Sequence, residues 1–202
     1  MKKFSAIMLG ISLTLRKDIV FHNGEPATSE DLKYTFQYLS ENSLGKTMDY
    51  INFDDVTIVD EYTVHVGMNY AYSALLDCLV KVSLICKSAC EEMGEEYGRA
   101  PIGSGPYKFV SWTSGDRIEL EANEDYWKYT PAIKNIVVRI ITEQAVQYIE
   151  LLTGGIDVAM DPLPADVLDV MENGDGSIEV VNGGQVAIYF LNLNYNSDNE
   201  AM

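Results

Sequence analysis

Basic residues are scarce in this chain of 202 amino acids, which carries 14 Lys and Arg against 31 Asp and Glu. The formal net charge is therefore −17, and no cluster of Lys or Arg offsets it. Such a protein repels phosphate backbones and anionic lipid surfaces. This excludes nucleic acid as a partner. The sequence also lacks an apolar run of about 20 residues, the length that a membrane-spanning helix requires.

Cysteine and histidine are rare too, with three and two copies. An odd number of cysteines, all between Cys78 and Cys90, does not fit the disulfide framework of a small secreted domain. Cys86 and Cys90 stand four residues apart with no histidine nearby, so they lack the further ligands of a zinc site. We expect buried free thiols here, and neither a metal nor a cofactor.

Signatures of catalysis are missing as well. The chain has no Gly-x-Ser-x-Gly, His-Glu-x-x-His, Cys-x-x-Cys or phosphate-loop pattern. Asp54 and Asp55 would point to opposite faces of a strand and would not converge on one substrate atom. His22 falls in a turn and His65 alternates with valines in a strand, positions typical of structural roles. The sequence favours a protein that is not an enzyme.

What the chain does contain is an alternation of helical and strand-like segments, with 47% hydrophobic residues. Thr28 lies three residues before Asp31, and Leu32 and Phe36 follow at helical spacing, which predicts a capped helix to about residue 39. Turn residues between β-branched runs predict hairpins. We expect hairpins at 56–66 and 107–122, other strands at 19–21, 133–141, 156–159, 177–181 and 185–193, and other helices at 73–79, 88–97, 142–152 and from 164 to 173. A short apolar strand is expected between the helices at 73–79 and 88–97. The pattern predicts an α/β or α+β fold.

Residues 1–15 allow two interpretations. Lys2 and Lys3, followed by an apolar stretch, resemble the front of a secretory signal peptide, although no small-x-small cleavage site follows. The alternative is an ordinary first strand at 11–15. The sequence leaves both open.

Four segments share their residue types and order with one known protein family. Residues 13–32 contain Leu-Arg, Phe-x-x-Gly and Thr-Ser-Glu-Asp, and residues 101–109 read Pro-Ile-Gly-Ser-Gly-Pro-Tyr-Lys-Phe. Residues 117–127 contain Leu-x-x-Asn-x-x-Tyr-Trp, and residues 151–157 contain Leu-x-x-Gly-x-x-Asp in the form Leu-Leu-Thr-Gly-Gly-Ile-Asp. Together they resemble the family-5 solute-binding proteins of ABC importers, which include dipeptide, oligopeptide and nickel binders. Serine replaces the family's usual alanine in the first segment and its threonine in the second.

The resemblance implies a periplasmic-binding-protein-like class II fold of mixed α and β structure, present here in part. Two lobes are expected, with residues 16–98 as the smaller α/β lobe and residues 99–202 as part of the larger mixed-sheet lobe. Complete members of the family are more than twice as long. The resemblance therefore implies a fragment from the N-terminal half of such a protein.

The same resemblance implies binding of a small solute, with a peptide favoured, in the periplasm or at the outer face of the cell membrane. The partners would be that solute and the membrane permease of an ABC importer, and the two lobes would close around the ligand. Five residues match positions near the family's cleft: Met160, Asp161, Gln185, Tyr189 and Asn192. Asp161 as a helix cap and Tyr189 as a core residue are the alternative interpretation. The sequence also leaves open nickel, a sugar or haem as solute, a truncated product that binds nothing, and an interaction module that self-associates.

Overall fold

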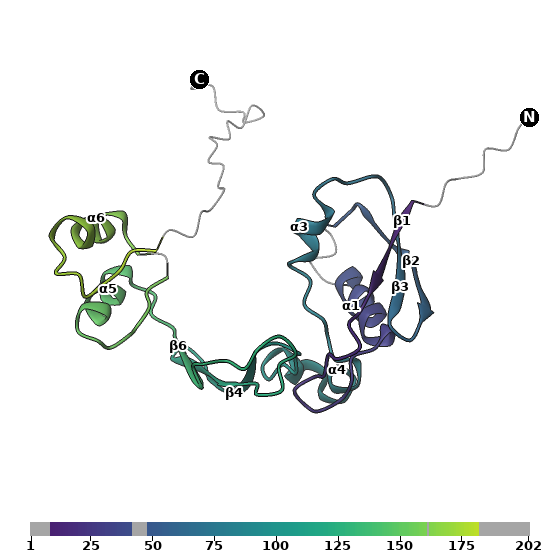
Figure 1. Ribbon diagram of the computed structural model, residues 1–202, viewed down its shortest axis with the longest axis horizontal. Coiled ribbons are helices and arrows are strands. Elements are labelled where there is room, and N and C mark those ends of the chain that lie inside the picture. Colours follow the sequence, from purple (N-terminus) through teal and green to yellow (C-terminus); the bar gives the residue numbers. More distant parts are fainter. Residues whose placement is uncertain (1–8, 42–47, 161, 182–202) are drawn as a thin grey trace, which may run out of the picture. The chain divides into compact units, whose positions relative to one another are not determined.

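The structure, a computed structural model, describes residues 9–41, 48–160 and 162–181. The chain divides into two compact units, Met1–Ile140 and Ile141–Met202, and both helices and strands are present (Figure 1). This mixture agrees with the predicted α/β class. The predicted lobe division between residues 98 and 99 is a different partition and stays a prediction. None of the helices in the described ranges has the length and apolarity to cross a membrane.

The first sheet of the larger unit has three antiparallel strands in the order β1-β3-β2. Its elements are β1 (Gly10–Thr14), β2 (Ile51–Asp60), β3 (Thr63–Met68) and the adjoining helix α1 (Ser29–Glu41). Val64 and Val66 alternate along β3 toward one face, where they are almost fully buried. The apolar side of α1 packs there through Leu32 and Phe36, as its helical spacing predicts. One helix thus covers one face of this sheet and makes the main core.

The start of α1 depends on the carboxylate of Asp31. Its Oδ2 atom accepts hydrogen bonds from the Thr28 backbone N–H at 2.9 Å and from the Thr28 hydroxyl at 3.0 Å. The sequence predicts that this hydroxyl accepts a bond from the helix backbone, but it donates to the carboxylate instead. Asp31 Oδ1 also accepts the N–H of Lys87, the first residue of α4 (Lys87–Met93), at 3.0 Å. One buried carboxylate therefore caps two helices.

The segment after β3 is less regular than predicted. It contains α3 (Leu75–Leu79), α4 and the 3₁₀ helix η1 (Gly94–Gly98), and no strand lies between α3 and α4. Cys86 precedes α4 and is buried beside Phe21, and Cys90 is buried one turn later. The expected burial holds for these two thiols, whereas Cys78 is only partly buried.

The second sheet of the larger unit is also antiparallel, with the order β4-β5-β6. Its strands are β4 (Tyr107–Thr113), β5 (Arg117–Ala122) and β6 (Asn135–Arg139). A register shift between Phe109 and Ser111 makes a bulge in β4. Unlike the first sheet, none of its strand residues is fully buried.

The smaller unit contains α5 (Gln144–Leu152) and α6 (Pro164–Asn173), which the Tyr148 hydroxyl joins by donating to Asp169 at 2.9 Å. Glu143, rather than Thr142, occupies the position before α5. The strands predicted at 156–159 and 177–181 do not form. A strand needs a partner for its backbone groups, and no pairing involves these segments in the described ranges. The strand predicted at 185–193 lies outside the described residues.

Candidate functional site

Three of the four sequence motifs meet at the carbonyl group of Gly105. This oxygen accepts a hydrogen bond from His22 Nε2 and another from Asn123 Nδ2, each at 3.0 Å. The backbone N–H of His22 donates to the Gly103 carbonyl at 2.8 Å. We call His22, Gly103, Gly105 and Asn123 the motif junction. The side chains of His22 and Asn123 and the backbone groups of Gly103 and Gly105 thus join segments that are distant in the sequence.

The hydrogen bonds of His22 determine its tautomer. Nε2 faces a carbonyl oxygen and so carries the proton, while Nδ1 accepts the Gly103 backbone N–H at 3.3 Å. Burial lowers the pKa of His22, against the opposing effect of the bond to Gly105, and the charge of Lys108 lowers it further. The neutral ring is therefore the form that fits the motif junction. Both ring nitrogens are used, which leaves His22 a structural role rather than that of a catalytic base.

A second contact joins the same motifs. The guanidinium of Arg16 lies over the ring of Trp127, 4.2 Å from its centroid, and also pairs with Asp18 at 2.8 Å. That hydrogen-bonded pair raises the pKa of Arg16 and lowers the pKa of Asp18. Arg16 belongs to the first motif and Trp127 to the third. This contact therefore joins the first and third motifs, as the motif junction also does.

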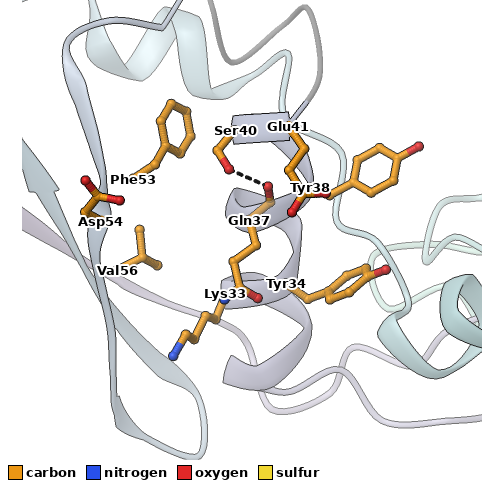
Figure 2. A pocket seen from close by; sticks show the side chains of 9 residues that line it. All are labelled: Lys33, Tyr34, Gln37, Tyr38, Ser40, Glu41, Phe53, Asp54 and Val56. Carbon is orange, nitrogen blue, oxygen red and sulfur yellow. Dashed lines mark hydrogen bonds between the residues drawn. The ribbon is translucent and has the colours of Figure 1, made fainter.

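A groove between α1 and β2 is lined mainly by polar and aromatic side chains and has a volume of about 540 Å³. Figure 2 shows Lys33 pointing to the β2 side of α1, while Tyr34 and Tyr38 point away from β2. A hydrogen bond with the Cys90 thiol is the main cause that raises the pKa of Tyr34 to about 12. Lys33 makes no ion pair with Asp54 across the groove. Its polar groups do not converge, and we assign no ligand to it.

A second cavity, of about 620 Å³, lies over the second sheet. Its walls come from three strands, from the loop of the second motif and from the segment before α4. The lining is dominated by aromatic and branched side chains, a composition typical of small-molecule sites. Within the described residues, no group of three or more His, Cys, Asp or Glu side chains is placed to hold a metal ion.

Of the five site residues predicted from the sequence, the structure describes one. Met160 is described, and its side chain is 82% exposed in the smaller unit. Asp161, Gln185, Tyr189 and Asn192 lie outside the described residues. The predicted cleft set therefore stays a prediction.

Sequence reasoning placed His22 in a turn and favoured a structural role, but it missed the long-range contact through which His22 acts. The turn itself is formed by neighbouring residues, because the Gly24 N–H donates to Phe21 O at 2.8 Å. The contact that matters is with Gly105, 83 positions away along the chain. The sequence held one indication of this contact: His22 and Gly105 both belong to segments that resemble the same protein family.

Comparison with known proteins gives one consistent family. The model for bacterial extracellular solute-binding proteins, family 5 Middle, matches residues 9–201. The chain is 27% identical over 190 residues to the probable D,D-dipeptide-binding periplasmic protein DdpA of Escherichia coli K12, covering 91% of this chain and 36% of that protein. It is 26% identical over 191 residues to the glutathione-binding protein GsiB of Pectobacterium atrosepticum, covering 92% and 37%. The chain thus spans little more than a third of these relatives.

Solved structures agree with the sequence comparison. NikZ from Campylobacter jejuni, in complex with Ni(L-His), superposes with a TM-score of 0.73 at 25% identity, over 86% of this chain and 36% of that one. DppA from Helicobacter pylori, in complex with the peptide STSA, gives a TM-score of 0.69 at 21% identity, over 84% and 38%. The described elements thus form part of a class II periplasmic-binding-protein fold.

Proposed function

Because the chain belongs to family 5 of the bacterial extracellular solute-binding proteins, we propose that it binds a peptide outside the cytoplasm and delivers it to the permease of an ABC importer. The family match over residues 9–201 is the observation that carries the proposal. Proteins of this family are binding components of ABC importers, not enzymes. The peptide is favoured because the relatives include proteins named for a D,D-dipeptide and for glutathione.

The proposed mechanism is closure of two lobes, residues 16–98 and residues 99–202, around the ligand. A ligand shifts such an equilibrium only through contacts that are better in the closed state than in the open one. We propose that Met160, Asp161, Gln185, Tyr189 and Asn192 make part of these contacts. The exposed thioether of Met160 supports this, because the side chain is accessible to a ligand.

A thermal shift experiment on the full chain tests binding. Di- to tetrapeptides, glutathione and nickel–histidine would be added separately, each up to millimolar concentration. At one hundred times its Kd a ligand stabilises the folded protein by about 2.7 kcal/mol, or roughly 5–10 °C in Tm for a domain of this size. A rise with peptides alone is the expected result. A rise with nickel–histidine alone would contradict the peptide assignment, and no rise with any of them would contradict binding.

Two further measurements test the residues and the motion. Tyr189→Ala and Asp161→Ala are expected to weaken peptide binding tenfold or more, with Tyr195→Ala as a control outside the proposed set. Small-angle scattering is expected to show a smaller radius of gyration with peptide than without it. Unchanged affinity in both variants would remove these residues from the proposed site.

Self-association is a second candidate function, and one observation favours it. No residue among the described part of the smaller unit is fully buried, and Val158, Ile149 and Met171 are all more than half exposed. Apolar surface of this kind invites contact with another protein. Sedimentation equilibrium distinguishes the candidates, since a concentration-dependent dimer without peptide binding is the result that self-association predicts.

A further inference from the structure

The peptide group between Ile102 and Gly103 is hydrogen-bonded on both sides. Its N–H donates to His22 Nδ1 at 3.3 Å, and its C=O accepts the Tyr97 hydroxyl at 2.7 Å. Tyr97 belongs to η1, and His22 belongs to the turn before α1. One rigid plane therefore lies between a ring that can gain a proton and a hydroxyl that can both donate and accept.

Two further hydrogen bonds hold His22 in place. Its Nε2 donates to the Gly105 carbonyl at 3.0 Å, and its backbone N–H donates to the Gly103 carbonyl at 2.8 Å. Neither bond uses the peptide group between Ile102 and Gly103. Both bonds can therefore persist when that peptide group changes its orientation.

Protonation of the His22 ring brings two donors face to face. Nδ1 accepts the Gly103 N–H in the neutral ring, but in the charged ring Nδ1 carries a proton and is itself a donor. A carbonyl oxygen would satisfy this new donor. The same peptide group carries one, Ile102 O, on the side toward Tyr97. Reversal of the peptide plane would exchange the positions of the N–H and the C=O.

Glycine at position 103 permits this reversal. Turning a peptide plane over changes the φ of the residue that follows it by about half a turn. Gly103 is not among the glycines with positive φ, so reversal carries it into the region that glycine adopts readily and other residues avoid. A Cβ atom at Gly103 would meet only His22 and Gly105, at 3.6–4.0 Å, which is ordinary contact. The form in the structure, which we call the resting form, therefore accepts alanine there, whereas the reversed form requires glycine.

The surroundings of His22 confine its protonation to acid. Burial is the main cause that lowers the pKa of His22, and the charge of Lys108 on β4 lowers it further, whereas the bond to Gly105 raises it. The ring therefore becomes charged below its ordinary value of 6.5.

The other charged groups around the ring offer it no carboxylate. Arg99 and Tyr107 line the cavity that His22 borders, and the described lining of that cavity contains no Asp or Glu. Glu25 lies in the same turn as His22, but its carboxylate accepts from Asn23 and Ser88. A charged His22 ring must therefore find its second acceptor in the backbone.

We propose that His22 is an acid-sensitive switch: protonation of Nδ1 reverses the peptide group between Ile102 and Gly103, so that Ile102 O accepts from the charged ring and the Gly103 N–H donates to the Tyr97 hydroxyl. The reversed form leaves the Tyr97 proton without its acceptor and keeps a charge in a half-buried site, which is why the resting form prevails above pH 6.5. Because His22 and Gly103 line the cavity over the second sheet, the switch changes the polar groups at its wall. It goes beyond the proposed function and does not depend on it.

The sequence allows this peptide group to be observed by itself, since Ile102-Gly103 is the only Ile-Gly pair in the chain. The full chain, labelled with ¹³C at isoleucine carbonyls and ¹⁵N at glycine, gives one NMR correlation for it. NOEs from its amide proton would be recorded from pH 7.5 to pH 4.5. The Cε1–H signal of His22, assigned with His22→Asn, reports the charge of the ring. We expect the NOE of the Gly103 N–H to pass from the His22 ring to the Tyr97 ring as His22 becomes charged.

Two variants are expected to move the pKa of His22 in opposite directions. Gly103→Ala fits the resting form but opposes reversal, so the charged ring lacks an acceptor and its pKa should fall by about half a pH unit or more. Tyr97→Phe removes the donor that holds Ile102 O, so its pKa should rise by about the same amount. Gly98→Ala is the matched control, because a Cβ atom there meets nothing within 4 Å and Gly98 does not have a positive φ. It should leave the titration of His22 unchanged.

Four results would overturn the proposal. The first is an NOE between the Gly103 N–H and His22 that persists when the ring is charged, and the second is a His22 titration that Gly103→Ala does not alter. The third is a ring that stays neutral throughout the pH range. The fourth is the same change of NOE in His22→Asn, which would assign the reversal to another group. If Tyr97→Phe does not fold, Gly103→Ala decides alone. No peptide ligand is added, so a negative result leaves the proposed function untouched.

Discussion

The two sheets of the larger unit have the same number of strands and the same antiparallel pairing, yet only the first has a buried face. In the first, α1 lies over β3 and brings Val64 to complete burial. In the second, β5 has an equally regular alternation, but no described helix covers Ile118 and Leu120. Alternation therefore shows which face is apolar, and only the tertiary partner determines whether that face is a core or a surface for contacts.

The largest expected effect contrasts a phenylalanine from each region. Phe36 lies on α1, is 1% exposed and packs in the core between α1 and the first sheet. Phe36→Ala is expected to lower the free energy of unfolding by about 3–5 kcal/mol. Phe109→Ala in the partly buried face of the second sheet is expected to cost about 1 kcal/mol, since less apolar surface returns to water. Urea denaturation followed by circular dichroism measures both. Equal losses would show that the second sheet is covered in solution.

Asp31→Ala tests how much its carboxylate stabilises α1, the helix that covers the first sheet. The variant loses the acceptor for Thr28 and for the first N–H of α4, and two helix starts lose their cap. We expect a loss of about 2–3 kcal/mol by the same measurement. Glu30→Ala is the control, because Glu30 is exposed and makes only a 3.4 Å ion pair with Lys87. A loss as small as that of the control would mean that α1 needs no cap once it is packed.

Val→Thr substitutions compare the two sheets with a change that keeps the shape of the side chain but adds a hydroxyl. Val64→Thr places a hydroxyl in a site with 0% exposure and is expected to cost about 1–3 kcal/mol. Val138→Thr makes the same change at a residue 45% exposed in the second sheet, where water can reach the hydroxyl, and should change stability by less than about 0.5 kcal/mol. Comparable costs would contradict the open face.

The sequence predicted those parts of the fold that depend on neighbouring residues. Thr28, Asp31 and Phe36 mark α1 because a helix start and an apolar side are local properties. The hairpin of β4 and β5 follows from its turn, in which Gly115 has a φ of +76°. Strands were predicted wrongly where an apolar segment pairs with no other strand in the part of the chain that the structure describes, as at residues 156–159.

The site was less predictable than the fold for the same reason. The motif junction joins His22 to Gly105 over 83 positions, and no periodicity encodes a contact of that length. The cavity over the second sheet forms from side chains of three strands and from Arg99 beside Trp112. Such contacts arise only in the folded chain, so local sequence patterns do not predict them. Of the predicted cleft residues, only Met160 lies in the described ranges. The family resemblance indicated the function, but it did not give the geometry.

The smallest expected effect concerns the motif junction, which links a turn near the first sheet to the loop before the second. Burial holds the pKa of His22 below its ordinary value of 6.5, so between these two pKa values the unfolded chain binds more protons than the folded one. The stability that His22 contributes is complete above pH 6.5 and is lost as the pH falls through the lowered value. Protonation also removes the acceptor for the Gly103 N–H, a bond worth about 1 kcal/mol. Urea midpoints measured from pH 7.5 to pH 5 should therefore fall more steeply for the native chain than for His22→Asn, whose side chain does not titrate. Parallel curves would show that the ring stays neutral or that the junction does not limit stability, and the link between the two regions would then rest on Arg16 and Trp127.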